Sequence, residues 1–457
     1  MKKKLVIPLE VKNRELDGAC RLSIPFLIDG WTIYIGQKQQ IFPFIPQFKE
    51  CLWFLKSIVP GEISLLKKIK SNNNKISTLD VEGLVTHYNN FAVISRFSKE
   101  TIKISDFIFF WGKHYQKRVK KYFNISSKKL FPIGSPIADG WKKKYKNKNS
   151  KPKKKILIAT SFTLVNSYRS NDHIKLMLDN VGPISKDEYD KHSAYLKNLV
   201  NLAQVGFDEY KKLLDKIFIK YNNFKFFIRP HPGEDKNFWQ KYISKYKNVE
   251  FDNKAKITDS LKDVSHFIHF NSTSFYAAEI NKINTFMYFP KKKFPELFKL
   301  ISPEVVELSN IITEEKKFLN LKNLKPVKKN KNYSHFLSNF SYKSHENSSN
   351  KIFSIINKNN FYEIDRKNDP FNLLSFLYYF IYKVKHFLSF ILGHIGIKRF
   401  KLSKFRNKKV SYYKWQPLKE KEIFDIFKSI RPNNIDLKYI NIKRHFFGMY
   451  KIYYKKK

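Results

Sequence analysis

The fold is set by residues 5–36, which read LVIPLEVKNRELDGACRLSIPFLIDGWTIYIG. The apolar run Leu5–Leu9 predicts a strand, and the apolar spacing over Arg14–Leu27 predicts a helix that Pro25 ends or kinks. A second strand is predicted at Trp31–Gly36, after a turn. Strand, helix and strand in so short a stretch form a βαβ unit, which implies a parallel sheet with a right-handed crossover.

Further strand-like segments continue this first unit. They lie at Gly83–Val85, Phe107–Gly112 and Leu130–Gly134, with a helix predicted over Lys113–Tyr122. Residues 142–155 then interrupt the pattern, because nine of these fourteen residues are Lys. Such a run is typical of a solvated linker, so we expect a first domain over residues 1–141.

The strand and helix pattern restarts after the linker. Strands are predicted at Ile156–Ser161, Phe224–Arg229, Val249–Phe251, His266–Phe270 and Thr285–Phe289, and helices at Val205–Tyr221, Lys236–Lys247 and Ser274–Asn281. This alternation predicts a second α/β domain over residues 156–315. The chain is therefore expected to be an α/β protein with two successive Rossmann-like domains that face a cleft.

Residues 316–457 differ from both units, and we expect a basic, largely helical extension there. Within it, residues 370–397 are largely apolar, and Lys383 and Lys385 are the charged residues of that segment besides two His. The uncharged run before Lys383 is shorter than the roughly 20 residues that a membrane span needs. Two explanations stay open: a helix lying in the membrane interface, and a core helix of a C-terminal subdomain.

The charge balance invites a nucleic-acid interpretation that we do not favour. The 457 residues include 88 Lys and Arg against 39 Asp and Glu, a net charge of +49, but only 11 of the 88 are Arg. Dedicated nucleic-acid binders favour Arg for its bidentate contacts. The enriched residue types are also those of AT-rich codons. Compositional drift is our first explanation and an anionic membrane surface the second, and we expect no specific nucleic-acid partner.

Other features of the composition narrow the class of protein. Hydrophobic residues make up 42% of the chain, which excludes wholesale disorder. The two cysteines, Cys20 and Cys51, exclude a disulfide framework and a multi-cysteine zinc site. The apolar run near the N-terminus is too short for a signal peptide. We expect a cytoplasmic protein, with the inner face of the cytoplasmic membrane as a peripheral location.

The segment Arg229-Pro230-His231-Pro232-Gly233 follows a predicted strand of the second unit. Ligands in open α/β sheets bind at the carboxyl ends of strands, so this loop is a candidate site. Two prolines fix the backbone around His231, and Arg229 can meet a phosphate bidentately. The loop suits binding of a nucleotide phosphate and its stabilisation as it leaves, whereas the simpler explanation is a rigid turn.

Hydroxyl side chains follow two other strands of the second unit. Ser272, Thr273 and Ser274 lie at a strand-to-helix junction, where they can cap the helix or contact a phosphate. Glu279 could reach a ribose hydroxyl or only complement the helix dipole. The remaining candidates for the donor side of the site follow the first strand of this unit, and they are Thr160, Ser161 and Asn166.

Carboxylates of the first unit are candidates for acid–base chemistry. Asp80 and Glu82 lie beside a glycine, and a carboxylate facing the second domain could deprotonate an acceptor hydroxyl. Arg14 and Glu15 begin the first helix and could contact an acceptor or form a surface ion pair. The sequence shows no metal-ligand spacing, no Walker A motif and no dinucleotide-binding glycine motif, so we expect no metal and no bound cofactor.

Taken in order, these segments resemble bacterial surface-carbohydrate biosynthesis proteins of the GT-B glycosyltransferase type. The resemblance extends in pattern to sialyl-, Kdo- and CDP-glycerol transferases and covers residues 5–290. Its matching segments are Glu10 with Arg14-Glu15-Leu16, Asp80–Gly83, Asp106–Gly112, Gly134–Asp139, Ile156–Asn166, Arg229–Pro232 and His269–Glu279.

The resemblance implies a nucleotide-activated donor bound mainly by the second domain. It assigns the general base to Glu82, with Asp80 as second candidate because Val81 stands where the family motif has an acidic residue. It assigns the donor-phosphate histidine to His231, and the phosphate-binding hydroxyl pair to Ser272 and Thr273. Transfer would be independent of metal, with the nucleotide-sugar as substrate.

We therefore expect a glycosyltransferase of surface polysaccharide biosynthesis, of capsule or lipopolysaccharide type. It would transfer a sugar from a CMP-linked or similar donor to a lipid-linked or growing glycan. Two alternatives stay open. One is a transferase of polyol phosphate from a CDP donor, as in teichoic-type polymers, and the other is a non-catalytic GT-B-like assembly protein.

Overall fold

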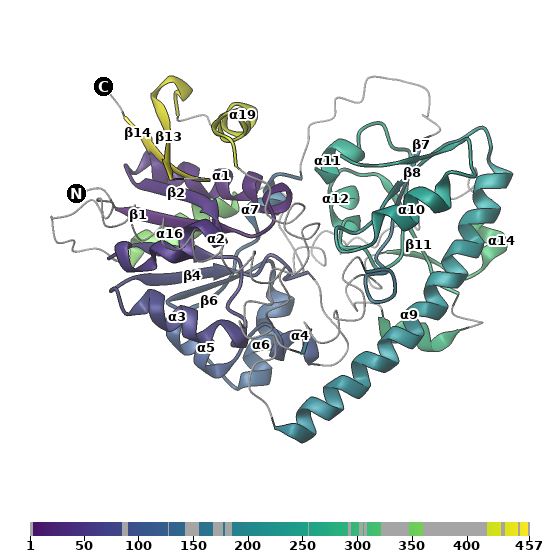
Figure 1. Cartoon of the computed structure of the whole chain (residues 1–457), viewed down its shortest axis with the longest axis horizontal. Coiled ribbons are helices and arrows are strands. Elements are labelled where there is room, and N and C mark those ends of the chain that lie inside the picture. Colours follow the sequence, from purple (N-terminus) through teal and green to yellow (C-terminus); the bar gives the residue numbers. More distant parts are fainter. Residues whose placement is uncertain are drawn as a thin grey trace, which may run out of the picture.

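The computed structural model contains two α/β units side by side, each built on its own sheet (Figure 1). We call them the first unit, on sheet A, and the second unit, on sheet B. The structure describes residues 3–84, 90–126, 128–141, 155–167, 177–178, 185–254, 256–290, 294–300, 305, 309–320, 347–359, 418–430, 435–446 and 448–455.

Sheet A has eight strands. In spatial order they are β13 (Ile440–Phe446), β14 (Met449–Tyr454), β2 (Thr32–Gln37), β1 (Lys4–Leu9), β3 (Leu52–Leu55), β4 (Lys75–Leu79), β5 (Phe107–Phe110) and β6 (Leu130–Pro132). The six strands from β2 to β6 are parallel, and β14 joins β2 antiparallel. Strand order therefore reverses between β1 and β3, which is the topological switch point of this sheet.

Sheet B has six parallel strands. In spatial order they are β12 (Asn310–Ile312), β11 (Asn284–Tyr288), β10 (His266–His269), β7 (Lys155–Ala159), β8 (Lys225–Arg229) and β9 (Val249–Phe251). Counted from β7, this is the 3-2-1-4-5-6 order of Rossmann folds, so strand order reverses between β7 and β10. The two parallel sheets confirm the predicted α/β class with two Rossmann-like units.

Helices and short 3-10 turns cover both sheets. Those of the first unit are α1 (Lys12–Ile28), α2 (Lys38–Ile41), η1 (Phe42–Gln47), η2 (Pro60–Glu62), α3 (Ile63–Lys70), α4 (Phe91–Ile94), α5 (Lys99–Ile104), α6 (Lys113–Phe123), α7 (Pro136–Asp139), α16 (Ser348–Lys358), α19 (Glu420–Ile430) and η6 (Leu437–Tyr439). Those of the second unit are α9 (Lys186–Lys220), α10 (Lys236–Ile243), α11 (Ile257–Ser260), α12 (Phe275–Ile280), η3 (Pro295–Leu300) and α14 (Glu315–Phe318).

Alternate side chains of the sheet A strands point to opposite faces, and this alternation separates two cores. Ile7 and Ile35 belong to a cluster on the face of α1, whereas Val6 and Tyr34 belong to a second cluster with side chains of α3, α5 and α6. Helices thus bury both faces of the sheet, as a parallel sheet requires.

Three local predictions differ from the structure. Gly83 and Leu84 form a turn, not a strand, because the loop after β4 folds back under Trp111. The long helix α9 begins at Lys186, well before the predicted Val205, with Ser185 and Glu188 forming a capping box. Strands β3 (Leu52–Leu55) and β4 (Lys75–Leu79) were not predicted from the sequence.

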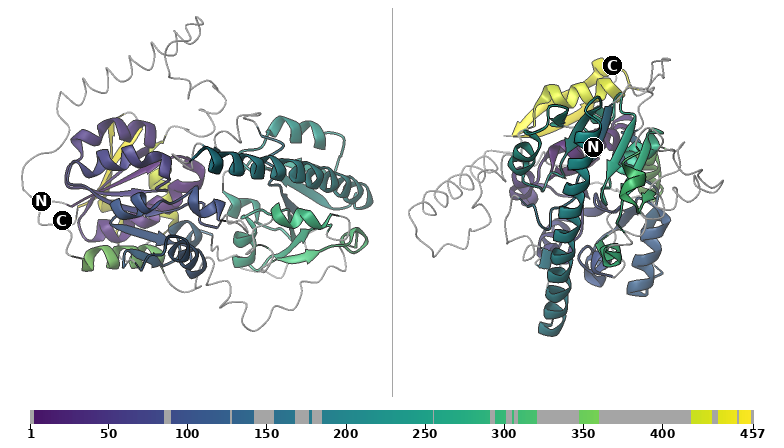
Figure 2. Two further views of the ribbon diagram at one scale, coloured as in Figure 1. Left: turned by 90° about the horizontal axis from the view of Figure 1, so that it is seen from below. Right: turned by 90° about the vertical axis from the view of Figure 1, so that its right-hand side faces the viewer.

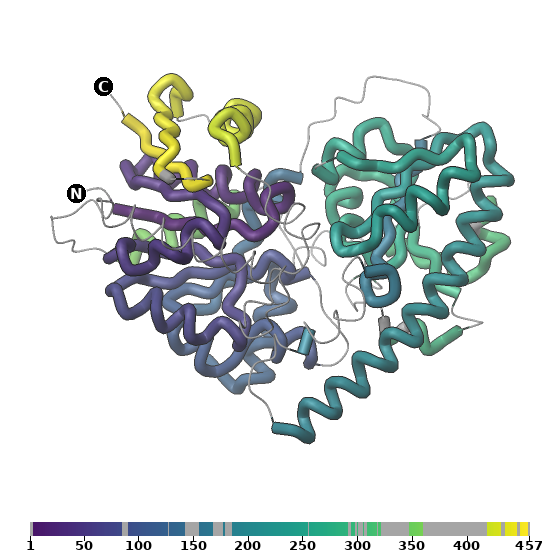
Figure 3. The backbone as a smooth tube through the Cα atoms, viewed as in Figure 1, coloured from purple at the N-terminus to yellow at the C-terminus, as the bar shows by residue number. Residues whose placement is uncertain are grey.

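The predicted helical extension is wrong for its last residues. Strands β13 and β14 form a hairpin that extends sheet A beyond β2, so the C-terminal segment lies against the N-terminal one in the tube of Figure 3. Ile440, Ile442 and Ile452 are buried there, and Gly448 makes the turn with φ +76°. Helices α16 and α19 pack against α1. The described elements from α16 onward therefore complete the first unit.

Two sequence predictions concern residues outside the described ones. The lysine-rich linker lies outside them apart from Lys155, which begins β7. The apolar segment 370–397 also lies outside them. Among the described residues, no helix is both long and apolar enough to cross a membrane.

Candidate functional site

The candidate donor side of the site lies at the switch point of sheet B. Thr160 directly follows β7, and the segment Phe270–Ser274 follows the adjacent strand β10. His231 follows β8, which pairs with β7 on its other side. Where the strand order reverses, the loops that leave two neighbouring strands lead to opposite faces of the sheet and leave a crevice between them. Ligands of open α/β sheets bind in this crevice. The predicted hydroxyl and histidine loops therefore come together at one sheet edge.

Glu234 organises this edge, although the sequence analysis did not single it out. Its carboxylate is buried and accepts hydrogen bonds from Thr160 Oγ1 (2.8 Å), the His231 backbone N–H (3.0 Å) and Trp239 Nε1 (2.7 Å). Burial raises the pKa of Glu234, against the opposing effect of these hydrogen bonds. The loops after β7 and β8 are thus tied together through one side chain.

The ring of His231 is oriented by its own loop. Nδ1 accepts a hydrogen bond from the Gly233 backbone N–H at 3.1 Å. In the neutral ring, an accepting Nδ1 places the proton on Nε2, at the other side of the imidazole. The residue is solvent-exposed, at the carboxyl edge of the sheet. This tautomer can donate a hydrogen bond to a phosphate oxygen.

The side chain of Arg229 contacts residues near the edge strand β9. Its Nη1 contacts Asp252 Oδ2 at 2.9 Å, the Lys254 carbonyl at 2.8 Å and Ser260 Oγ at 2.8 Å. Such a side chain supports the loops after β8 and β9. Because Nη1 is engaged by these three partners, the predicted phosphate contact would have to use Nε or Nη2 of the guanidinium.

The hydroxyl loop after β10 is held in a tight turn. Ser272 is buried, and its Oγ accepts a hydrogen bond from the Ser274 backbone N–H at 3.3 Å. Thr273 and Ser274 are partly exposed, and Ser274 makes no side-chain cap to α12. Asn271 adopts a left-handed conformation with φ +48°. Ser272 therefore shapes the turn, while Thr273 and Ser274 are the more accessible hydroxyls.

His269 supports this loop from beneath. It is fully buried at the end of β10 and stacks on Phe275 of α12 with ring centroids 5.2 Å apart. Burial lowers the pKa of His269 to about 3, so its ring is neutral at physiological pH.

The other predicted donor residues differ in accessibility. Glu279 is buried and accepts a hydrogen bond from the Thr285 hydroxyl, which directs it into the second unit. Asn166 is buried, and its backbone carbonyl accepts from the Asp235 N–H at 2.8 Å. Ser161 is partly exposed beside Thr160. Of these residues, Ser161 is the best placed to touch a ligand.

The first unit places Asp80 and Glu82 at the carboxyl end of β4, where Arg96 holds both. Arg96 forms a bidentate pair with Asp80, with Nε 2.7 Å from Oδ2, and its Nη1 lies 3.2 Å from Glu82 Oε2. Asp80 also accepts the Glu82 backbone N–H at 3.0 Å. Arg96 has no motif around it in the sequence, and only the tertiary structure shows its role.

The two carboxylates differ in accessibility. The Asp80 side chain is 6% exposed and the Glu82 side chain 40%. The charge of Arg96, followed by that of Arg14, outweighs burial and lowers the pKa of Glu82 to about 2. Glu82 is therefore the carboxylate that an acceptor can reach, and it is fully ionised at neutral pH.

Arg14 and Glu15 lie at the switch point of sheet A. Arg14 bridges Glu15 (3.1 Å) and Glu82 (3.4 Å), and Glu15 is buried and accepts the Glu10 backbone N–H at 2.7 Å. Glu10, after β1, pairs with Lys56, after β3, across the strand reversal. These carboxylates raise the pKa of Lys56, although burial lowers it. The predicted acceptor side is thus one connected charge network.

Gly83 allows this loop to pack closely under Trp111. A Cβ on Gly83 would lie 2.6 Å from Trp111 Cδ1, too close for any side chain. The Trp111 indole donates to the Asp80 carbonyl at 2.6 Å, and its ring lies 5.5 Å from that of Trp141. The glycine is therefore required by the tryptophan that covers the loop.

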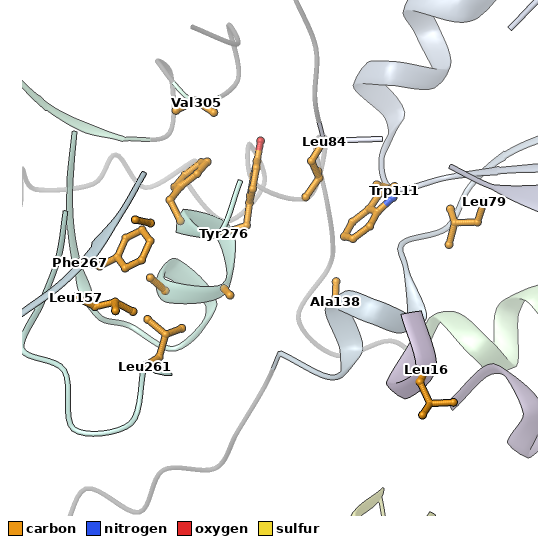
Figure 4. Packing of buried hydrophobic residues seen from close by; sticks show 14 of the residues in the cluster. Leu16, Leu79, Leu84, Trp111, Ala138, Leu157, Leu261, Phe267, Tyr276 and Val305 are labelled. Atoms are coloured by element: carbon orange, nitrogen blue, oxygen red, sulfur yellow. The ribbon is translucent and has the colours of Figure 1, made fainter. Parts of the chain in front are cut away.

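Elements at the carboxyl edges of the two sheets approach one another. Figure 4 shows Tyr276 of α12 on the side that faces Leu84 and Trp111 of the first unit. Lys256, before α11, pairs with Asp17 of α1 at 3.0 Å. The Asn281 amide donates to the Trp141 carbonyl at 2.8 Å. The candidate donor and acceptor sides thus lie toward a shared boundary.

The long helix α9 also links the units. Its C-terminal half packs in the second unit, whereas its N-terminal part reaches the first unit (Figure 2). There, His192 and Tyr195 lie 5.5 and 6.2 Å from Phe91 of α4, measured between ring centroids. Within the described residues, no group of three His, Cys, Asp or Glu side chains is arranged to hold a metal ion.

Comparisons with known proteins give similarity of structure alone. No protein-family model and no curated protein sequence matches the chain. Among solved structures, UDP-GlcNAc 2-epimerase from Neisseria meningitidis bound to UDP-GlcNAc is 13% identical, with 78% of this chain and 100% of that chain covered and a TM-score of 0.44. A variant of the wall teichoic acid polymerase TagF is 12% identical, with 78% and 89% covered and a TM-score of 0.48. We draw no functional inference from similarities this distant.

Proposed function

We propose that this chain is a transferase that binds a nucleotide-activated donor on the second unit and an acceptor hydroxyl on the first. The observation that carries the proposal is the convergence, at the switch point of a Rossmann-ordered sheet, of an oriented histidine and two hydroxyl loops. In an open α/β sheet this is the position at which nucleotide phosphates bind.

The phosphate of the nucleotide donor would lie between the loop after β8, which contains His231, and the loop after β10, which contains Thr273 and Ser274. His231 Nε2–H, Thr273 and Ser274 would donate hydrogen bonds to its oxygens, while Glu234 holds the loops after β7 and β8 in place. As the bond to the transferred group breaks, negative charge grows on the departing phosphate. Fixed donors stabilise that charge without reorganising, which lowers the barrier.

Glu82 is the better candidate for the general base. Its carboxylate is accessible, whereas both oxygens of Asp80 are engaged by Arg96. A carboxylate with a pKa near 2 accepts protons poorly, and efficient general bases titrate closer to the working pH. We infer that the acceptor displaces Arg14, the longer contact at 3.4 Å, and that this raises the pKa of Glu82 before proton transfer.

The finer assignment follows the family resemblance. The transferred group would be a sugar from a CMP-linked or similar donor, and the acceptor a lipid-linked or growing surface glycan, without a metal. Transfer of a polyol phosphate from a CDP donor would use the same histidine and the same fold. A non-catalytic assembly protein would keep the fold without binding nucleotide.

A thermal-shift panel with CMP, CDP, UDP and GDP tests the proposal. We expect one nucleotide to raise the melting temperature of the wild type, because ligands that bind only the native state stabilise it. His231→Ala should abolish that shift. The matched control is His266→Ala, at the amino end of β10 on the opposite edge of the same sheet, which should retain it.

Two outcomes would count against the proposal. No shift with any of the four nucleotides would favour the assembly protein, and an equal shift in wild type and His231→Ala would remove the histidine from the site. Once a nucleotide is identified, incubation with its sugar and polyol conjugates shows which group leaves it, by mass spectrometry of the products.

A further inference from the structure

Three helices of the first unit form a continuous surface on one face of sheet A. Helices α3, α5 and α6 follow β3, β4 and β5, and right-handed crossovers place all three on the same side of the sheet. Figure 1 shows them along the lower edge of this unit. Leu66, Ile102 and Val119, one from each helix, share the core beneath them. Their outer sides form one surface, which we call the α3–α5–α6 face.

This face concentrates positive charge. Its three helices contain ten basic residues and one acidic residue, Glu100, a net charge of +9. On the other face of the same sheet, α1, α7, α16 and α19 contain seven basic and six acidic residues, a net charge of +1. Helix α9 of the second unit contains seven basic and six acidic residues, so its net charge is also +1. Uniform compositional drift would not produce this difference.

Helix α6 shows the arrangement most clearly. Tyr115, Val119 and Phe123 are buried at a spacing of four residues, and Lys113, Lys117 and Lys121 are exposed at the same spacing. The helix contains no acidic residue, and it ends beside Tyr122, which is 43% exposed. An apolar stripe faces the core, so the lysine side is directed to solvent.

We propose that the α3–α5–α6 face is a docking surface for an anionic lipid bilayer. Lysines within a Debye length of anionic headgroups are attracted without any specific geometry, and tyrosine is enriched at the headgroup level. A nucleic-acid surface would be expected to use arginine and stacking aromatic rings. Nine of the ten basic residues here are Lys, which favours the bilayer.

The α3–α5–α6 face lies close to the acceptor side of the candidate site. Helix α6 begins at Lys113, two residues after Trp111, whose indole contacts the Asp80 carbonyl. Docking of α6 would bring the Asp80–Glu82 loop close to the headgroups, where a lipid-linked acceptor would lie. This consequence rests on the proposed function, but the docking surface does not, since it can be tested without turnover.

Sedimentation with vesicles tests the proposal on the full chain. The probes are phosphatidylcholine vesicles with and without about 30% phosphatidylglycerol, at about 0.1 M salt. We expect binding to the anionic vesicles alone. The test variant carries Lys113→Gln, Lys117→Gln and Lys121→Gln, and it should bind about 100-fold more weakly, at roughly fivefold per lysine.

The control variant carries Lys358→Gln, Lys421→Gln and Lys428→Gln, all exposed on the opposite face of the same sheet. Both variants lower the net charge by three. An equal loss of vesicle affinity in the two variants would show that binding depends on the total charge and not on this face, and it would overturn the proposal. Retained binding in the α6 variant would overturn it as well. A 20-nucleotide RNA that displaces the protein from vesicles, and whose own binding depends on the α6 lysines, would reassign the face to nucleic acid. Circular dichroism confirms that each variant is folded.

Discussion

Replacement of Arg96 by methionine separates the structural from the chemical role of the acceptor-side carboxylates. Arg96→Met keeps an unbranched side chain in place but removes every donor to Asp80 and Glu82 that the guanidinium supplies. Asp80 is then a buried carboxylate without its cation, since its side chain is only 6% exposed. Removal of one partner of a buried ion pair costs about 3–5 kcal/mol. We therefore expect that loss from the free energy of unfolding of the first unit.

Glu82 responds differently because it is 40% exposed. Its pair with Arg96 is partly screened by solvent and should contribute no more than about 1 kcal/mol. Its pKa, now lowered to about 2 mainly by Arg96, should rise toward the ordinary value for Glu. A lowered pKa stabilises the native state above the unfolded pKa, and that stability is lost as the pH falls toward 2. The variant should therefore lose less stability than wild type between about pH 4.5 and pH 2.

Urea unfolding followed by tryptophan fluorescence and circular dichroism measures these changes. The double variant Arg96→Met, Asp80→Asn should be more stable than Arg96→Met alone, because it removes the unpaired charge, with a coupling energy of at least about 2 kcal/mol. Lys67→Met is the control, since Lys67 pairs with Glu100 at 2.7 Å where both side chains are exposed, and it should cost less than about 0.5 kcal/mol. A loss below about 1 kcal/mol in Arg96→Met, or additive effects in the double variant, would refute the reasoning.

Two further changes test the packing of the site. Glu234→Gln should destabilise the second unit by about 1–3 kcal/mol, because the amide nitrogen cannot accept a hydrogen bond from Trp239 Nε1 or the backbone N–H of His231. Since burial raises the pKa of Glu234, the stability that this group contributes to the wild type is present at low pH and falls as the pH rises. Thermal melts across pH should show that this dependence disappears in the variant. Gly83→Ala should cost about 1–3 kcal/mol because its Cβ would collide with Trp111; an unchanged urea midpoint would show that the loop can move aside.

The periodicity of the sequence was enough to predict most of the two sheets. Short apolar runs such as those at 107–110 and 156–159 are buried along their whole length, so a few consecutive apolar residues are enough to indicate each strand. Strand β4, KISTL, escaped prediction because Ser77 and Thr78 donate their hydroxyls to carbonyls of β3. Such polar residues are satisfied only by a neighbouring strand, which the sequence does not identify.

The candidate site was predictable to the level of loops but not of roles. The sequence placed His231 and Ser272 after strands, and the strand order then brought their loops to one edge. It could not show that Arg229 is engaged by Asp252 or that Arg96 holds Asp80 and Glu82. These pairings join residues that lie 14 to 23 positions apart, and a single sequence does not encode which partner is chosen.

Local periodicity and the composition at strand ends were enough to indicate the α/β class, the two successive units and the loops that hold the candidate chemistry. The tertiary fold was needed to show that residues 440–454 return to sheet A, that Glu234 joins two loops, and that the helices of the α3–α5–α6 face carry a net charge of +9 while those of the opposite face carry +1. The physical reason is the same in each case. Long-range pairing, burial and the handedness of crossovers set which residues meet, and none of these depends on the neighbouring sequence alone.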